Sequence, residues 1–223
     1  MSFWHHFPQA HCLPDHCNCE FISDAFIRQP SAFWSSLVYL ALGILLYQEV
    51  QNKNFKLKLW TSLTLLLGVS SMFAHMSFIQ LAMAMDFAAI IMVLSFFALT
   101  NFLELLKLSR VKILLTLVLY YISIVGVMYY MSKWSKIGVC LLIFLFALSD
   151  LLRSMGWNFL KAPLLQYTII MLVASFTFFI MDEMRIACDP HSPWQLHSFW
   201  HAGTAVSIYL YGKWRFSDLS PSL

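Results

Sequence analysis

Three histidines and one aspartate lie inside apolar stretches of this 223-residue chain, where ionisable side chains are rare. His75 falls near the end of one stretch, Asp86 lies inside the next, and His197 and His201 begin the last. Imidazole and carboxylate groups are costly in hydrocarbon, so they usually face a cavity or one another there and mark function. Catalytic zinc is often bound by three neutral imidazoles, which leave its fourth coordination position open. The pattern predicts a metal centre that activates water.

The spacing of these residues supports a shared site. His197 and His201 are four residues apart, so they lie on one face of a helix and can reach one ion. Ser71 precedes His75 by four residues, which puts its hydroxyl on the same face as that imidazole, one turn away.

Other interpretations of the same residues stay open. A single histidine at the end of a span is usually an interfacial residue, and a pair four apart can arise by chance. A bis-histidine haem would need His75 with either His197 or His201, which leaves one histidine and Asp86 unused. Asp86 alone can also act as a buried proton relay.

The composition is that of a polytopic membrane protein with one domain. Hydrophobic residues make up 60% of the chain and charged residues 11%, against about 25% charged in ordinary soluble domains. The mean hydropathy is +0.71. The net charge of +3 does not indicate nucleic acid as a partner.

Seven segments have the length and apolar character of membrane-spanning helices, which need about 17–25 residues. They lie at 33–49, 59–77, 79–103, 111–131, 136–152, 163–182 and 195–212. The expected fold is therefore an all-α bundle of seven transmembrane helices. It comprises an N-terminal cap at 1–32 outside the membrane, a transmembrane domain at 33–212 and a tail at 213–223.

The basic residues predict how this bundle is oriented. Seven spans place the termini on opposite sides. Ten of the 14 basic residues then share one side: Lys53, Lys56, Lys58, Lys107, Arg110, Lys112, Arg153, Lys161, Lys213 and Arg215. The positive-inside rule makes that side cytoplasmic. The N-terminus is then outside or lumenal, the C-terminus is cytosolic, and the three histidines and the aspartate share a similar depth near the outer face.

These motifs resemble the alkaline ceramidase family, seven-helix membrane hydrolases related to the adiponectin receptors. The resemblance rests on Ser71-Met-Phe-Ala-His75, on Asp86 eleven residues later, and on His197-Ser-Phe-Trp-His201 in the last span. The stretch Cys17-Asn-Cys-Glu20 looks like the bacterial ceramidase-like members. The resemblance extends from about residue 15 to residue 212.

The resemblance implies a role for each matching residue. His75, His197 and His201 would hold zinc, and Asp86 would handle the proton of the reacting water. Ser71 would contact that water, the metal site or the developing oxyanion. Two further matches are Trp200, inside the last motif, and an outer disulfide between Cys19 and Cys188.

Two groups outside these motifs are also candidates. Asp182, which ends the sixth span, either orients a metal-bound histidine or is simply interfacial. The calcium site of the eukaryotic family members would fall at Asn18, Glu20 and Gln29 here, and Asn18 and Glu20 remain candidate ligands. Gln29 stands where a glutamate is expected and Cys17 where an aspartate is usual. Calcium needs several oxygen ligands, so the sequence does not predict calcium regulation.

These observations lead to one main functional hypothesis and two alternatives. The main hypothesis is an intramembrane zinc-dependent amidase that cleaves ceramide or a related N-acyl membrane lipid into a fatty acid and a sphingoid-type amine. The first alternative is a receptor-like or scaffolding protein with structural zinc, and the second a haem or quinone redox protein. A bacterial inner membrane is favoured over an endoplasmic reticulum or Golgi membrane, and no oligomeric state is predicted.

Overall fold

The computed structural model describes residues 3–10, 18–50, 55–131 and 162–218, together with 135, 137–139, 141, 142 and 145. Within these ranges the regular structure is helical. No strand occurs among them, and the one isolated β-bridge joins Gln9 to Ile79. The prediction of an all-α protein is confirmed for this part of the chain.

Five helical segments are long and apolar enough to cross a membrane, which makes the chain an integral membrane protein. The first of them is divided at Ser36 into a short helix and a longer one. The helices in these segments are α1 (Pro30–Ser35) with α2 (Leu37–Val50), α3 (Phe55–Ser77), α4 (Gln80–Leu105), α5 (Arg110–Tyr130) and α7 (Pro163–Glu183). Five of the seven predicted spans are thus found, each displaced by a few residues at most at either end.

The two remaining predicted spans have different outcomes. The span predicted at 195–212 coincides with a real helix, α8 (Leu196–Asp218), but α8 is not among the five apolar segments. Its inner surface carries polar side chains, including buried Thr204 and Ser207, which lower its apolar character. The span predicted at 136–152 lies largely outside the described residues. The number of seven spans and the sidedness of the termini therefore stay predictions.

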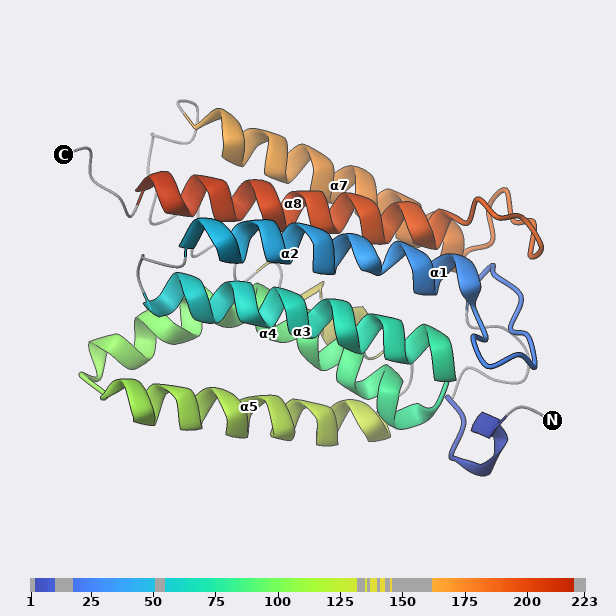
Figure 1. The fold of residues 1–223 in the computed structure, drawn as a ribbon, viewed down its shortest axis with the longest axis horizontal. Helices are drawn as coiled ribbons and strands as arrows, with labels where there is room; N and C mark the ends of the chain where they lie inside the picture. Colours follow the sequence, from blue (N-terminus) through green and yellow to red (C-terminus); the bar gives the residue numbers. More distant parts are fainter. Residues whose placement is uncertain are drawn as a thin grey trace.

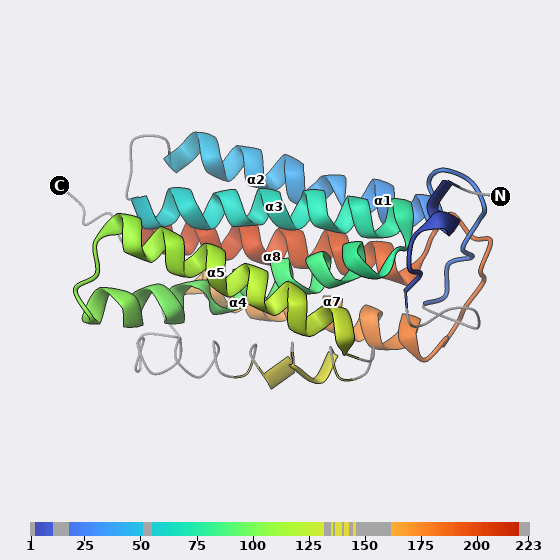
Figure 2. The same ribbon diagram turned by 90° about the horizontal axis from the view of Figure 1, so that it is seen from below.

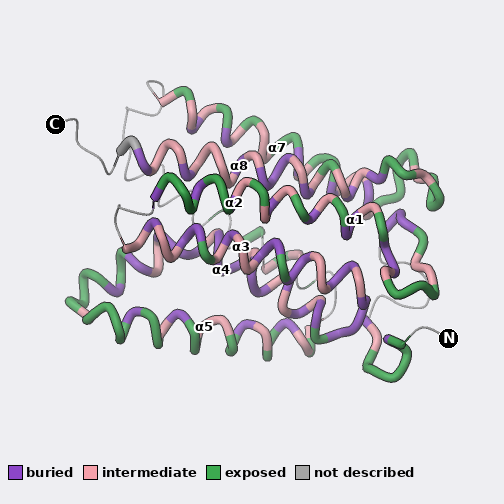
Figure 3. The backbone as a smooth tube through the Cα atoms, viewed as in Figure 1, coloured by how far each residue is buried: buried purple, intermediate pink, exposed green. Residues whose placement is uncertain are grey.

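The helices run side by side along the long axis of the molecule (Figure 1). Helix α8 lies between α2 and α7, and the view turned by 90° also places it inside the bundle (Figure 2). The short 3-10 helix η1 (Phe3–His6) lies at one end, and the last turn of α8 lies at the other. Buried residues concentrate between the helices, whereas α5 is largely exposed along its length (Figure 3). The central position of α8 surrounds its histidines with other helices.

Glycines allow two pairs of helices to approach closely. A Cβ atom on Gly203 of α8 would lie 2.0 Å from the Ser175 hydroxyl oxygen of α7. A Cβ atom on Gly68 of α3 would lie 2.6 Å from a methyl group of Leu40 on α2. Small residues at helix contacts are typical of membrane bundles, where close packing replaces the hydrophobic effect. The Gly203 contact holds the histidine-bearing end of α8 against α7.

A tight turn between α3 and α4 brings His75 and Asp86 to the same end of the bundle. Phe78 adopts a positive φ of 54°, an uncommon conformation for a bulky residue. Its N–H donates to the Ala74 carbonyl at 2.8 Å, and the Ala10 N–H donates to the Phe78 carbonyl at 3.1 Å. The N-terminal segment therefore binds directly to this turn and holds it in place.

A disulfide joins the N-terminal segment to the loop between α7 and α8. Cys19 and Cys188 are bonded with an S–S distance of 2.07 Å, across 169 positions of sequence. The disulfide implied by the family resemblance is thus confirmed. It ties the segment before α1 to the segment that leads into His197 and His201.

We expect the Cys19→Ser, Cys188→Ser double variant to unfold more easily than the wild type. Removing a native disulfide lowers the free energy of unfolding by about 2–4 kcal/mol, because the unfolded chain regains conformational freedom. Denaturant titration of both proteins in the same detergent measures the difference. A reductant should lower the wild-type midpoint and leave the variant unchanged. Equal midpoints for the two proteins without reductant would contradict the expectation.

Candidate metal centre

The three predicted histidines meet at one point in the bundle. His75 comes from the last turn of α3, and His197 and His201 come from the first two turns of α8. Their ring centroids are 5.0, 5.0 and 4.7 Å apart in pairs, which is close to an equilateral triangle. All three side chains are buried, and one ligand atom from each lies within 4.8 Å of the others. The three imidazoles can therefore share one metal ion.

Two of the imidazoles are oriented through Nδ1 by polar side chains. His75 Nδ1 lies 2.8 Å from the Oε1 atom of Gln29. His197 Nδ1 lies 3.4 Å from an oxygen of Asp182, a carboxylate with no exposed surface. The second distance is that of an ion pair and is longer than a well-formed hydrogen bond. In both residues Nε2 is left as the nitrogen for a metal.

The third imidazole is oriented by the kinked segment where α1 meets α2. His201 Nδ1 lies 2.9 Å from the Ser35 hydroxyl, 3.3 Å from the Ser36 hydroxyl and 3.2 Å from the Ala32 carbonyl. Metal-binding histidines almost always bond to such partners through their second nitrogen, which fixes the ring and its tautomer. All three histidines of the site have such a partner at Nδ1.

The chemistry of the donor set fits zinc. His75 Nε2 is buried and has no hydrogen-bond partner within the described part of the chain, although a buried polar atom without a partner is costly. A bound cation would satisfy it. Three buried histidines grouped in this way could bind a metal ion.

Asp86 and Ser71 lie beside the histidines, as the sequence predicts. The Asp86 side chain is buried and lines the same cavity as Ser71 and the three histidines. Its Oδ1 atom has no hydrogen-bond partner among the described residues. The Ser71 hydroxyl accepts a hydrogen bond from the Ser36 hydroxyl at 3.0 Å. A carboxylate oxygen with no donor bound to it is suited to take up a proton.

The three histidines, Asp86 and Ser71 all line one cavity of about 280 Å³. Its remaining wall is mainly apolar, and α4 contributes a stripe of side chains at helical spacing: Met83, Phe87, Ile90 and Leu94. Three further lining residues, Leu141, Val173 and Thr177, are also exposed on the outside of the bundle. The cavity therefore has a polar end at the histidines, an apolar body, and walls that reach the outer surface of the helices.

The three residues considered for calcium are neighbours, but their oxygens bind protein donors. The two oxygens of Glu20 accept the backbone N–H groups of Ser31 and Ala32 at 2.6 and 3.0 Å, at the start of α1. Burial raises the pKa of Glu20, and these two hydrogen bonds oppose that rise. The amide groups of Asn18 and Gln29 bind each other. The Gln29 side chain thus bonds to His75, and the Glu20 carboxylate bonds to the first backbone N–H groups of α1.

Asp182 and Trp200, the two further candidates near the metal ligands, have different contacts. Asp182, at the end of α7, faces His197 as the metal-orienting alternative requires. Trp200 lines the cavity, but its ring packs on Phe179 at 5.1 Å and Phe176 at 6.2 Å. It therefore forms part of the cavity wall beside the histidines.

We expect Asp182→Asn to weaken zinc binding. The neutral amide would support His197 less well than the carboxylate does, and losing such a partner typically costs about 10–100-fold in metal affinity. Competition with a chromophoric chelator in detergent measures the zinc Kd. Glu49→Gln is the matched control, because Glu49 lies in the last turn of α2 and is paired with Lys213 near the C-terminal end of α8, far along that helix from His197. An unchanged Kd for Asp182→Asn would show that the carboxylate is only structural.

Some residues at the site were not predicted from sequence. Ser36 and the backbone of Ala32 bind His201, and buried Tyr39 bonds to Thr204 beside it. The available signal was a pair of hydroxyl residues at the start of the first apolar span, followed by a tyrosine four positions after Ser35. Polar side chains spaced along one face of an apolar helix indicate a polar interior.

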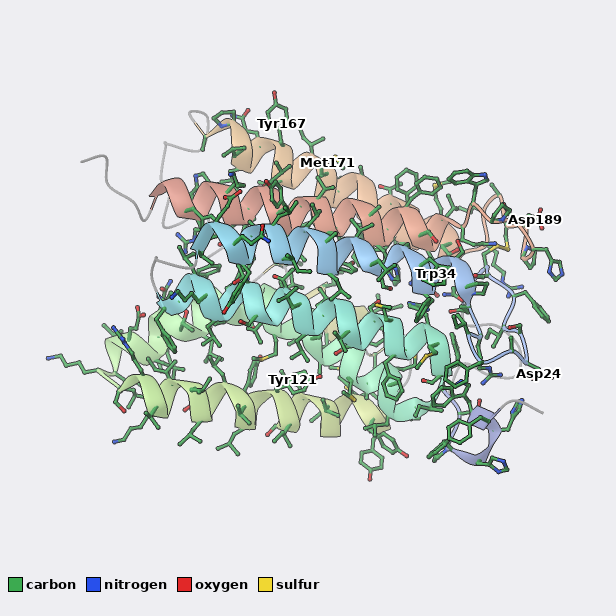
Figure 4. All side chains as sticks on the ribbon, in the orientation of Figure 1. Asp24, Trp34, Tyr121, Tyr167, Met171 and Asp189 are labelled. Atoms are coloured by element: carbon green, nitrogen blue, oxygen red, sulfur yellow. A yellow bond between two sulfur atoms is a disulfide. The ribbon has the colours of Figure 1, made fainter. Side chains whose placement is uncertain are left out.

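The segment before α1 and the loop between α7 and α8 lie at one end of the molecule. Figure 4 shows Asp24, Trp34 and Asp189 at this end, while Tyr167 and Met171 lie further along α7.

Neither a comparison with protein-family models nor a search of curated proteins finds a match to this chain. The function is therefore argued from the site itself.

Proposed function

We propose that the protein is an intramembrane zinc-dependent hydrolase that cleaves the amide bond of ceramide or a related N-acyl lipid. The observation that carries the proposal is the meeting of His75, His197 and His201 with the Asp86 carboxylate at the polar end of one apolar cavity. Zinc lowers the pKa of bound water to about 7 and so supplies a nucleophile at neutral pH.

The residues of the site can perform the proton transfers of amide hydrolysis. Water adds across the C–N bond, with its oxygen joining the carbonyl carbon and one proton joining the departing nitrogen. Asp86 takes that proton from water and delivers it to the amine, as a general base and then a general acid. The Ser71 hydroxyl can donate a hydrogen bond to the carbonyl oxygen while negative charge develops there. Fatty acid and free amine are the products.

The cavity supports a lipid as the substrate. Its apolar stripe on α4, which includes Phe87 and Ile90, can hold an acyl chain. Val173 of α7 lines the cavity and is 59% exposed, so the wall is continuous with a surface that would face lipid. A long-chain N-acyl lipid could enter without its acyl chain leaving an apolar environment.

The arrangement is less suited to the two alternative functions. Structural zinc sites have four protein ligands and are closed, whereas this histidine triangle lines a cavity. A haem held by two histidines needs its macrocycle between their rings. Here His75, His197 and His201 have ring centroids within 5.0 Å of one another, and the third ring would occupy that space.

Metal analysis combined with a lipid panel tests the proposal. The purified protein is assayed for zinc content and then incubated with ceramides, other N-acyl amines and matched esters, with products read by mass spectrometry. We expect about one zinc per chain and release of free amine from N-acyl lipids. Treatment with a chelator should stop the release, and added zinc should restore it.

Three results would change the proposal. A Soret band in the absorption spectrum would show haem and contradict the proposal. Zinc-loaded protein that releases no product from any lipid of the panel would favour a structural metal in a receptor-like protein. Release from esters alone would retain the hydrolase and correct the bond that it cleaves.

A further inference from the structure

We propose that Gln29 is a positioning residue that sets the tautomer and orientation of His75, and that Asn18 holds Gln29 in place for this task. Both residues lie in the segment before α1, outside the helices that carry the histidines. The inference rests on the metal site of the proposed function, and it does not depend on which bond is cleaved.

The orientation of the Gln29 amide follows from its neighbours. Gln29 Nε2 lies 3.2 Å from the backbone carbonyl oxygen of Glu20. A carbonyl can only accept a hydrogen bond, so the atom facing it has to be the NH₂ group. The other end of the amide, Oε1, therefore faces His75 Nδ1 at 2.8 Å.

This orientation determines which nitrogen of His75 carries the proton. The amide Oε1 atom has no hydrogen to give, so His75 Nδ1 has to be the donor. Nε2 then keeps its lone pair and is free of other hydrogen bonds within the described residues. The neutral imidazole with a proton on Nδ1 is the form that binds a metal through Nε2.

Asn18 and the backbone prevent the amide from turning over. The side chains of Asn18 and Gln29 pair reciprocally, each NH₂ group facing the carbonyl oxygen of the other. The Gln29 backbone N–H also donates to the His75 carbonyl at 3.0 Å. Gln29 has no exposed surface, so water cannot replace these bonds.

The disulfide anchors this arrangement. Asn18 is adjacent to Cys19, which is bonded to Cys188 nine residues before His197. The Cys19–Cys188 disulfide thus joins the segment that orients His75 to the segment that leads to His197. The Asn18 side chain bonds to Gln29, so we expect a change in Asn18 to reach His75 through Gln29.

Zinc affinity tests the inference without any lipid substrate. In Gln29→Met a side chain of similar length lacks the acceptor, and we expect the zinc Kd to rise about 10–100-fold. The cobalt-substituted protein should show a shifted and weakened visible absorption band, because the His75 ring is no longer held in one orientation. Gln29→Glu, which retains an acceptor oxygen, should lose less affinity than Gln29→Met.

A double-mutant cycle separates positioning from general damage. Asn18→Leu alone should weaken zinc binding, and in the Gln29→Met background it should have no further effect, because coupled residues are not additive. Thr100→Val is the control: Thr100 is buried and bonded to Phe96, well along α4 from the site, and we expect an unchanged Kd.

The outcomes distinguish this inference from the proposed function. A wild-type protein that binds no zinc would remove the metal site and the proposed function together. Wild-type zinc binding with an equal Kd and an equal cobalt spectrum in Gln29→Met would overturn the positioning role alone. Additive losses from Asn18→Leu and Gln29→Met would overturn the part of the inference that assigns Asn18.

Discussion

We expect His75→Ala to lose its zinc and its hydrolytic activity together. His75 is the one ligand that α3 contributes, so its loss leaves the two histidines of α8 alone. A residue that only orients a metal-binding histidine typically contributes about 10–100-fold in metal affinity, so losing a ligand itself should cost more than about 100-fold. Zinc per chain after dialysis, followed by the rate of amine release, measures both effects.

His191→Ala is the matched control for this variant. His191 is exposed in the loop between α7 and α8, where its ring contacts Phe21 at 5.1 Å. It lies outside the histidine triangle, and we expect normal zinc content and normal activity. If His75→Ala retained zinc at the wild-type level after dialysis, the assignment of the metal ligands would be wrong.

We expect Asp86→Asn to retain zinc and to lose most of its activity. The amide has nearly the same shape as the carboxylate, but it cannot take up a proton from water. General acid–base catalysis contributes about 10²–10⁴-fold to a rate, so we expect a loss of that size in kcat/KM. Asp86 is not among the three grouped ligands, so the zinc Kd should change little.

Asp189→Asn is the control for the aspartate substitution. Asp189 is exposed, and its carboxylate accepts the backbone N–H of His191 at 3.1 Å, a bond that asparagine can also accept. Its activity should match that of the wild type. If kcat/KM of Asp86→Asn stayed within a few-fold of the wild-type value, Asp86 would be excluded as the proton carrier. Substitution of Ser71 would then be tested in the same assay.

The ligands of the site were predictable from sequence because their positions depend on local rules. The spacing of His197 and His201 places them on one helix face, and span direction brings His75 to the same depth. The structure groups these three side chains. Asp86 was found by the same reasoning, because a carboxylate inside an apolar span is unusual.

The partners of the ligands were not predictable in the same way. Gln29 is 46 positions from His75, and Ser35 is 166 positions from His201. Those contacts depend on how the segment before α2 folds over the ends of α3 and α8. The family resemblance suggested Gln29 as a calcium ligand. In the structure its amide bonds to Asn18 and to the backbone carbonyl of Glu20.

The helix count shows a similar contrast. Strongly apolar segments such as 79–103 were located to within a few residues, as α4 (Gln80–Leu105) shows. Helix α8 was also located, yet its apolar character is low, because it carries His197, His201 and Thr204 in the interior. The polar residues that form the site thus lower the mean hydropathy of α8, and transmembrane helices are predicted from that hydropathy.

The bond between Cys19 and Cys188 has a consequence for the biogenesis of the protein. Cys188 leaves the ribosome 169 residues after Cys19, so the covalent link cannot close until α1 to α7 have been synthesised. His197 and His201 follow Cys188 within 13 residues. Assembly of the histidine cluster therefore follows synthesis of α8, and a host without an oxidising compartment should accumulate chains that lack this disulfide.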